Sequence, residues 1–188
     1  MSMGDRWREA EFETIFQEHY GRILRVTRRV LRTDSEAEEV CADVFLRLYR
    51  SGPGVTEKGP AGGWLYRTAT RAAIDALRAR RRRGEETEDD VIVQAIDPGE
   101  GPLTQMLRQE RVGEVRAVLA RMKVEKAQML LLRHSGVSYR EIAEAMQMDV
   151  HSVGSKLARA EAEFSSLYQR RQRLQAKTPQ LQTAKERQ

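Results

Sequence analysis

The sequence contains few cysteine, histidine and aromatic residues. Among 188 residues there are one cysteine, three histidines and 6% aromatic residues. A single thiol, Cys41, excludes an internal disulfide and a multi-thiolate metal site, and the histidines are too scattered to act as paired ligands. We therefore expect no metal, and we expect Cys41 to be a small buried residue on the apolar side of a helix.

Long hydrophobic runs are also missing. No stretch approaches the roughly 20 consecutive apolar residues that a membrane-spanning helix needs. The first residues, Met1 to Glu11, are charged and lack the apolar core of a secretory signal. These features predict a cytoplasmic protein without membrane insertion.

Motifs that carry out chemistry are absent as well. The sequence contains no glycine-rich phosphate loop, and no serine or cysteine nucleophile stands in a recognisable setting. Asp43 and Asp75 are candidate acids, but Asp43 is better explained as part of a docking surface and Asp75 as a helix-packing or arginine-pairing residue. We expect a protein that is not an enzyme, with no small-molecule substrate and no cofactor.

Charge is plentiful and unevenly distributed. There are 33 Lys and Arg against 28 Asp and Glu, a net charge of +5. Arginines cluster at positions 78 and 80–83, whereas the acidic stretch that follows from Glu85 contains no base before Arg108. Phosphate is the natural counter-surface for such a basic end, although a charge run can also be a solvated face.

Apolar residues recur at helical spacing through most of the chain, and no stretch alternates as a strand does. We predict a first helix over 12–31 and a second helix that begins at Ser35, whose hydroxyl caps it. Further helical segments are predicted from Trp64 to Gly84 and from Leu103 to Gly136. Seven Gly and Pro residues predict a loop over 51–63.

The fold class is therefore all-α, with two small helical domains joined by a flexible acidic linker. We expect the first domain at 5–84, the linker at 85–103, the second domain at 104–168 and a basic C-terminal tail at 169–188. Composition predicts that this tail is disordered or weakly helical, with an interruption at Pro179.

The second domain contains a pattern typical of a helix-turn-helix. Ser138 and Glu141 form a potential capping box, Gln147 and Met148 form the turn, and Asp149 can cap the next helix. One exposed face of that helix can offer base contacts from its early residues and phosphate contacts from later ones. An ordinary helical hairpin with a polar surface remains the alternative.

Three motifs in order resemble those of bacterial RNA polymerase sigma factors of the extracytoplasmic-function (ECF) group, in which sigma regions 2 and 4 are joined by a linker. They are Ser35–Phe45, then Trp64–Arg67 with Ala73–Arg78, then Leu130–Ala143 with Val153–Arg159. The resemblance covers roughly 12–164. It implies a factor that binds core RNA polymerase, recognises and melts promoter DNA, and is commonly held inactive by an anti-sigma factor.

The resemblance also implies roles for particular residues. The acidic helix would bind polymerase through Glu36, Glu38, Glu39 and Asp43. The third helix would read and melt the minus-ten element through Trp64, Tyr66, Arg67, Arg71, Arg78 and Arg81. The helix-turn-helix would read the minus-thirty-five element through Arg140, His151, Ser152, Ser155, Lys156 and Arg159.

The chain departs from the family pattern at several of its functional positions. It has Ala61 where an aromatic is usual, Thr70 and Arg71 where Arg and Asn are usual, and Gly154 where a recognition-helix lysine is usual. Ala42 and Gln147 replace a common glutamine and the usual turn glycine. The alternative function is a free-standing helix-turn-helix regulator that binds operator DNA as a dimer.

Overall fold

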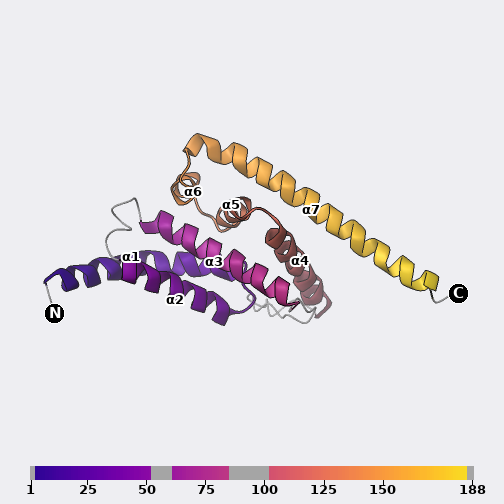
Figure 1. Ribbon diagram of the computed structural model, residues 1–188, viewed down its shortest axis with the longest axis horizontal. Helices are drawn as coiled ribbons and strands as arrows, with labels where there is room; N and C mark the ends of the chain where they lie inside the picture. Colours follow the sequence, from indigo (N-terminus) through magenta and orange to yellow (C-terminus); the bar gives the residue numbers. More distant parts are fainter. Residues whose placement is uncertain (1–2, 52–60, 85–101, 186–188) are drawn as a thin grey trace.

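The computed structural model describes residues 3–51, 61–84 and 102–185 (Figure 1). Every regular element in these ranges is a helix, which confirms the all-α prediction. The helices are α1 (Met3–Arg28), α2 (Asp34–Ser51), α3 (Ala61–Arg83), α4 (Pro102–Arg121), α5 (Val124–His134), α6 (Tyr139–Met146) and α7 (Val150–Lys185). The acidic stretch 85–101 and most of the predicted loop, 52–60, lie outside the described residues. None of these helices combines the length and the apolar character needed to cross a bilayer.

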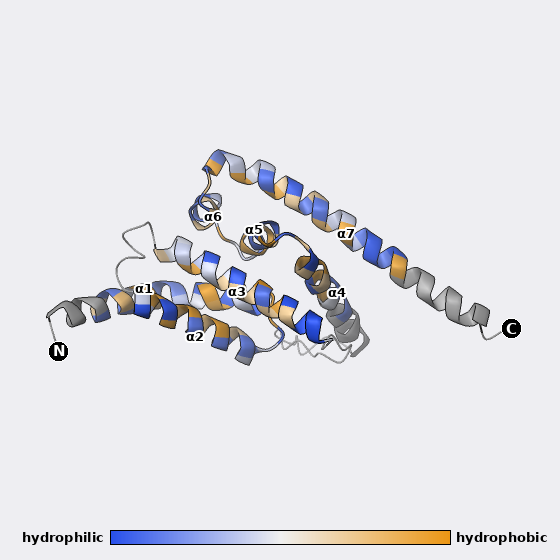
Figure 2. Cartoon of the chain, viewed as in Figure 1, coloured by the Kyte–Doolittle hydropathy of each residue, from blue (hydrophilic) through white to orange (hydrophobic). Residues whose placement is uncertain are grey.

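Helices α1, α2 and α3 pack against one another and form the first half of the molecule. Figure 2 shows hydrophobic and hydrophilic residues on different sides of the same helices. The predicted stripe of α2 is buried, and it includes Cys41, Val44 and Phe45. Because burial raises the pKa of the Cys41 thiol to about 11, this cysteine is the inert core residue that the sequence predicts.

The cap of α2 differs from the prediction. Thr33, not Ser35, caps the helix, since its Oγ1 accepts a hydrogen bond of 3.1 Å from the backbone N–H of Glu36. The Glu36 carboxylate in turn accepts one from the Arg32 N–H at 3.1 Å. The helix begins at Asp34, so Ser35 already lies within its first turn.

Helix α3 begins at Ala61, three residues before the predicted start at Trp64. Its first turn contains Gly62 and Gly63, which sequence reasoning assigned to the loop. Both are buried, and a Cβ on Gly62 would stand 2.9 Å from His19 Cε1. A Cβ on Gly63 would stand 3.2 Å from the backbone carbon of Glu144. These glycines therefore permit close helix packing and do not break the helix. At the other end, Gly84 has a φ of +71° and terminates α3 as predicted.

The second half contains the predicted helix-turn-helix. Ser138 and Glu141 form the full capping box at the start of α6. Gln147 adopts the left-handed conformation at φ 52°, so it makes the turn without a glycine. Asp149 Oδ1 accepts a hydrogen bond of 2.7 Å from the His151 N–H and so caps α7. These local predictions are confirmed.

Helix α7 is longer than the sequence indicated. It runs without interruption past Pro179 to Lys185, and its yellow end extends away from the other helices in Figure 1. Packing carries it beyond Phe164: Leu167 and Tyr168 lie against the core, and the Tyr168 hydroxyl donates to Glu114 of α4 at 2.9 Å. The expected interruption at Pro179 is thus wrong, and of the two alternatives for the tail the backbone up to Lys185 is helical.

The two halves pack against each other through α3. Its partners in the second half are α4, α5 and α6, and the buried hydrophobic residues of both halves form one continuous cluster. We call the contact of α1 and α3 with α4–α6 the seam. The seam decides which predicted functional residues are accessible.

Candidate polymerase and nucleic-acid interfaces

The acidic surface of α2 is largely open. Glu38, Glu39 and Asp43 are exposed, and Asp43 pairs with Arg47 at 2.6 Å. Glu36 differs because it is half-buried and forms an ion pair with Arg80 of α3. Burial alone would raise the pKa of the Glu36 carboxyl, but hydrogen bonds from Arg80 and from the Arg32 backbone lower it. Glu36 therefore ties α2 to α3. The other three predicted docking carboxylates are exposed, and of these Glu38 pairs with Arg28 at 3.2 Å.

The predicted minus-ten residues divide into two groups. Arg71 is exposed and lies 3.8 Å from its predicted partner Asp75, Arg81 is partly exposed, and Trp64 is partly buried against the core. Tyr66, Arg67 and Arg78 instead face the seam. In this conformation α3 presents only part of the predicted surface to solvent.

Tyr66 is 2% exposed, and the Arg22 guanidinium lies 5.6 Å from the centre of its ring. Burial raises the pKa of its phenol. Stacking on a base would require a flat, accessible ring face, which this packing does not offer. The predicted contact of Tyr66 with minus-ten DNA therefore depends on a change in its surroundings.

Two arginines of α3 bind the carboxyl ends of helices in the second half. Arg67 donates to the carbonyls of Ala145 and Glu144, at the end of α6, the second at 3.4 Å. Arg78 donates to Ala120 at 3.2 Å and to Met122 at 2.6 Å, at the end of α4. The last carbonyls of a helix lack intrahelical donors and carry partial negative charge, so a guanidinium is a favourable partner.

A buried polar contact lies between these arginines. The Thr70 hydroxyl donates to the Tyr66 carbonyl at 2.7 Å and accepts from Gln128 Nε2 of α5 at 2.9 Å. The same Gln128 nitrogen lies 3.0 Å from the Arg67 carbonyl. Thr70 thus satisfies a polar side chain of the second half at the seam.

Sequence reasoning did not identify Gln128 or Arg116. Gln128 is the one polar residue in the apolar run from Ala127 to Leu132, which is the signal that could have found it. Arg116 is 6% exposed and donates to the carbonyl of Leu31, in the turn between α1 and α2. Burial, with nearby Arg32, lowers the pKa of Arg116 to about 10.

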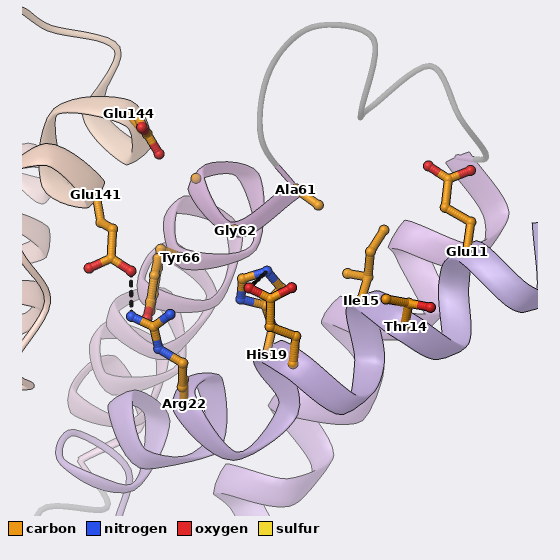
Figure 3. A pocket seen from close by; sticks show the side chains of 12 residues that line it. Glu11, Thr14, Ile15, His19, Arg22, Ala61, Gly62, Tyr66, Glu141 and Glu144 are labelled. Atoms are coloured by element: carbon orange, nitrogen blue, oxygen red, sulfur yellow. Dashed lines mark hydrogen bonds and ion pairs between the residues drawn. The ribbon is translucent and has the colours of Figure 1, made fainter.

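A cavity of about 550 Å³ lies where α1, α3 and α6 meet (Figure 3). Arg22 of α1 forms an ion pair with Glu141 of α6 across it. Burial alone would raise the pKa of Glu141, but hydrogen bonds from Ser138 and Arg22 lower it. His19 lines the same cavity, and burial lowers the pKa of its imidazole. Glu141 therefore serves both the α6 cap and the seam.

The helix-turn-helix face is open to solvent. The start of α7 brings together the predicted residues of the recognition helix: His151, Ser152, Ser155, Lys156 and Arg159. All are exposed except the half-buried Ser152, whose carbonyl accepts from the Ser155 hydroxyl at 3.1 Å. Arg140 is exposed on the neighbouring α6, where it pairs with Glu144 at 3.4 Å. The arrangement can present the hydrogen-bonding side chains of His151, Ser152 and Ser155 to a DNA groove, together with the cations Lys156 and Arg159.

Comparison with known proteins gives two family matches. Sigma-70 region 2 matches residues 15–83, and Sigma-70 region 4 matches residues 113–164. The first match covers α1 to α3 from Ile15 onward, and the second covers α4 from Gly113 to its end, all of α5 and α6, and the start of α7.

Curated relatives agree with these matches. The chain is 28% identical over 160 residues to the ECF RNA polymerase sigma factor SigE of Mycolicibacterium smegmatis, covering 83% of this chain but 61% of that protein. It is 29% identical over 157 residues to the RNA polymerase sigma-H factor of Pseudomonas aeruginosa, covering 79% and 81%. A solved complex of the sigma factor RpoE with the anti-sigma factor NepR from Bartonella quintana aligns at a TM-score of 0.48 and 14% identity, over 85% of this chain and 97% of that one.

Proposed function

Because this chain belongs to the ECF group of the sigma-70 family, we propose that it binds core RNA polymerase and directs it to promoters, where it recognises and helps to melt the DNA. The observation that carries the proposal is the succession of the two sigma regions, each with an accessible charged face. The protein then acts in the cytoplasm with polymerase and has no chemistry of its own.

The acidic face of α2 supports the polymerase contact. Glu38, Glu39 and Asp43 are exposed on one helix. Exposed carboxylates attract a basic partner and accelerate encounter with it, and here Glu38 and Asp43 would exchange their exposed ion pairs with Arg28 and Arg47 for that partner. Core RNA polymerase is the partner that we propose for this face.

The exposed start of α7 supports recognition of the minus-thirty-five element. His151 is exposed in the first turn of α7, and we assign base-edge contacts to such early residues. Lys156 and Arg159 are exposed further along the helix, and we assign phosphate contacts to them. Recognition of the minus-ten element is assigned to α3. An anti-sigma partner stays a prediction of the family resemblance.

The proposal is tested by mixing the purified chain with bacterial core RNA polymerase and with a pool of duplexes that carry two randomised promoter blocks. We expect co-elution with core, and permanganate-reactive thymines in the duplexes that the complex selects. Tight binding of intact duplex without any association with core would instead support the free-standing regulator. That result would contradict the sigma-factor proposal.

A further inference from the structure

Helix α7 continues well past the part of the chain that matches Sigma-70 region 4. The match ends at residue 164, whereas the helix runs without a break to Lys185, and we call residues 165–185 the α7 extension. Core packing holds its first turns, because Leu167 and Tyr168 lie against the hydrophobic cluster and Glu114 of α4 accepts hydrogen bonds from Tyr168 and Gln172. Its far end projects away from the other helices in Figure 1. Neither matched sigma region accounts for this extension.

The charge of the α7 extension has one sign. Between Glu163 and Glu186 the sequence contains three arginines and two lysines but no acidic residue. Glu163 itself forms an ion pair with Lys126 of α5. Arg170 and Arg173 are both exposed, and no carboxylate stands one turn away from either of them on the same helix. Their guanidinium groups can therefore bind an anionic partner.

The two exposed arginines lie on the same side of α7 as the proposed recognition residues. His151, Ser155 and Arg159 follow one another at intervals of four residues, and Ser166, Arg170 and Arg173 continue the series at intervals of seven, four and three. Such intervals return to one face of an uninterrupted α-helix. All six residues are exposed, and we call this face the α7 stripe.

The opposite side of α7 packs on the protein. Val153 and Leu157 are buried there, and Phe164 and Leu167 lie against the same core. Because this packing continues past residue 164, it fixes the rotation of the helix about its axis in the extension as well as at the start. The α7 stripe therefore points in one direction from the recognition residues to Arg173.

The length of the stripe decides what its far end can contact. Arg173 lies fourteen residues beyond Arg159, which is about 21 Å along the axis at about 1.5 Å per residue. The major groove of DNA is only about 12 Å wide. A straight helix whose first turns enter the groove has therefore left it at Arg173, where it passes the sugar–phosphate backbone. Duplex DNA carries one negative charge per about 1.7 Å of its axis, so phosphate is the chemistry that faces the stripe there.

We propose that the α7 extension is a second DNA contact, in which Arg170 and Arg173 bind backbone phosphates beside the base pairs that the start of α7 reads. This inference rests on the proposed function and adds a site outside both matched sigma regions. Phosphate contacts strengthen and orient binding but carry no base sequence. The extension therefore sets the affinity and its salt dependence, while the choice of sequence stays with the start of α7.

Removing both charges tests the contact. We expect the complex of core polymerase with Arg170→Gln/Arg173→Gln to bind duplexes selected from the randomised pool about tenfold less tightly than the wild-type complex. Each phosphate contact contributes about 0.9 to the slope of log affinity against log salt concentration, so the magnitude of that slope should fall by about two. Co-elution with core and the preference for the selected sequence should be unchanged.

A matched pair of single substitutions separates position from total charge. Ser166 lies on the α7 stripe, whereas its exposed neighbour Ser165 lines a groove bordered by α4, α5 and α7. Ser166→Arg should tighten DNA binding several-fold and steepen the salt slope by about one. Ser165→Arg adds the same charge on a different side of the helix and should leave the affinity within about twofold of wild type.

Three results would overturn the inference. They are an unchanged salt slope in the double arginine variant, equal gains from Ser165→Arg and Ser166→Arg, and a loss of core binding in the double variant, which would mean that the extension contacts a protein surface. Lack of core association by the wild-type chain would instead overturn the proposed function. The same DNA measurements made on the free chain, in which the α7 stripe is exposed, would still decide between the remaining outcomes.

Discussion

At the scale of single residues, the same side chains serve local folding and the contact between the two halves. Glu141 closes the capping box of α6 and also pairs with Arg22 across the seam. Thr70 replaces the usual arginine of the family pattern, and its hydroxyl accepts the hydrogen bond from Gln128. The departure at this position thus has a structural explanation in the contact between the halves.

His19 predicts a pH dependence of stability. Burial lowers the pKa of its imidazole, as does nearby Arg22, while Glu18 and Glu141 act in the opposite direction. The unfolded chain therefore binds a proton more readily than the folded one. The contribution of His19 is fully present above its unfolded pKa of about 6.5 and is lost as the pH falls toward the lower folded pKa.

Urea unfolding measured from pH 7.5 down to about pH 5.5 spans that window. We expect the free energy of unfolding to decline with falling pH, and the decline to be smaller in His19→Gln. An equal decline in the two proteins would assign the pH dependence to other groups.

At the scale of the helices, the predicted binding residues of α2 and α7 are mostly exposed, whereas part of the predicted DNA-binding surface of α3 is buried. The first turns of α2 and α7 are both fixed by side-chain caps, from Thr33 and Asp149. Capping sets where each helix begins and hence which residues face outward. The exposed faces of these two helices therefore follow largely from local sequence.

Reversing the charge of α2 tests its role. We expect Glu38→Lys/Glu39→Lys to abolish co-elution with core polymerase while the circular dichroism spectrum and the urea midpoint stay close to wild type, because both side chains are exposed. The matched control Glu36→Gln disrupts the pair with Arg80 and should lower stability while sparing core binding. Unchanged affinity for core in the double variant would remove the docking assignment.

The recognition helix gives a complementary prediction. Arg159→Ala should weaken binding of the polymerase complex to the upstream element, with a loss of about tenfold, and leave core binding intact because Arg159 is exposed on α7, far along the chain from α2. Affinity for duplexes with and without the selected upstream block, measured at one salt concentration, provides the test. Impaired core binding in this variant would show that the two faces are assigned wrongly.

At the scale of the whole molecule, the two halves share one hydrophobic cluster and a set of polar contacts through α3. Arg67 and Arg78 of α3 and Arg116 of α4 contribute to this arrangement by binding carbonyls of the other half. Because each half completes the packing of the other, we expect them to unfold together.

Cooperativity can be measured directly. Urea unfolding followed by tryptophan fluorescence and by far-ultraviolet circular dichroism should give coincident single transitions for the wild-type chain. Gly63→Leu, which inserts a side chain between α3 and the Glu144 backbone, should separate the transitions, whereas Gly113→Ala should not. Two separate transitions in the wild-type chain would mean that the halves are energetically independent.

Local sequence determined much of this protein. Helical periodicity indicated the all-α fold, and the capping box of Ser138 and the position of the turn at Gln147 followed from residue types over a few positions, whereas the left-handed backbone of Gln147 is a finding of the structure. The motifs also pointed to the family, which the comparisons support.

Only the tertiary structure decided which of the predicted surfaces are accessible. Whether Tyr66 or Arg67 faces solvent depends on α5 and α6, which lie far along the chain. The helical periodicity of α3 does not encode how these two helices approach it. The glycines at 62 and 63 illustrate the same point: locally they predict a loop, but close packing against His19 and Glu144 accommodates them within α3. Contacts between distant segments overrode local preference there because packing free energy exceeds the cost of about 1 kcal/mol for glycine in a helix.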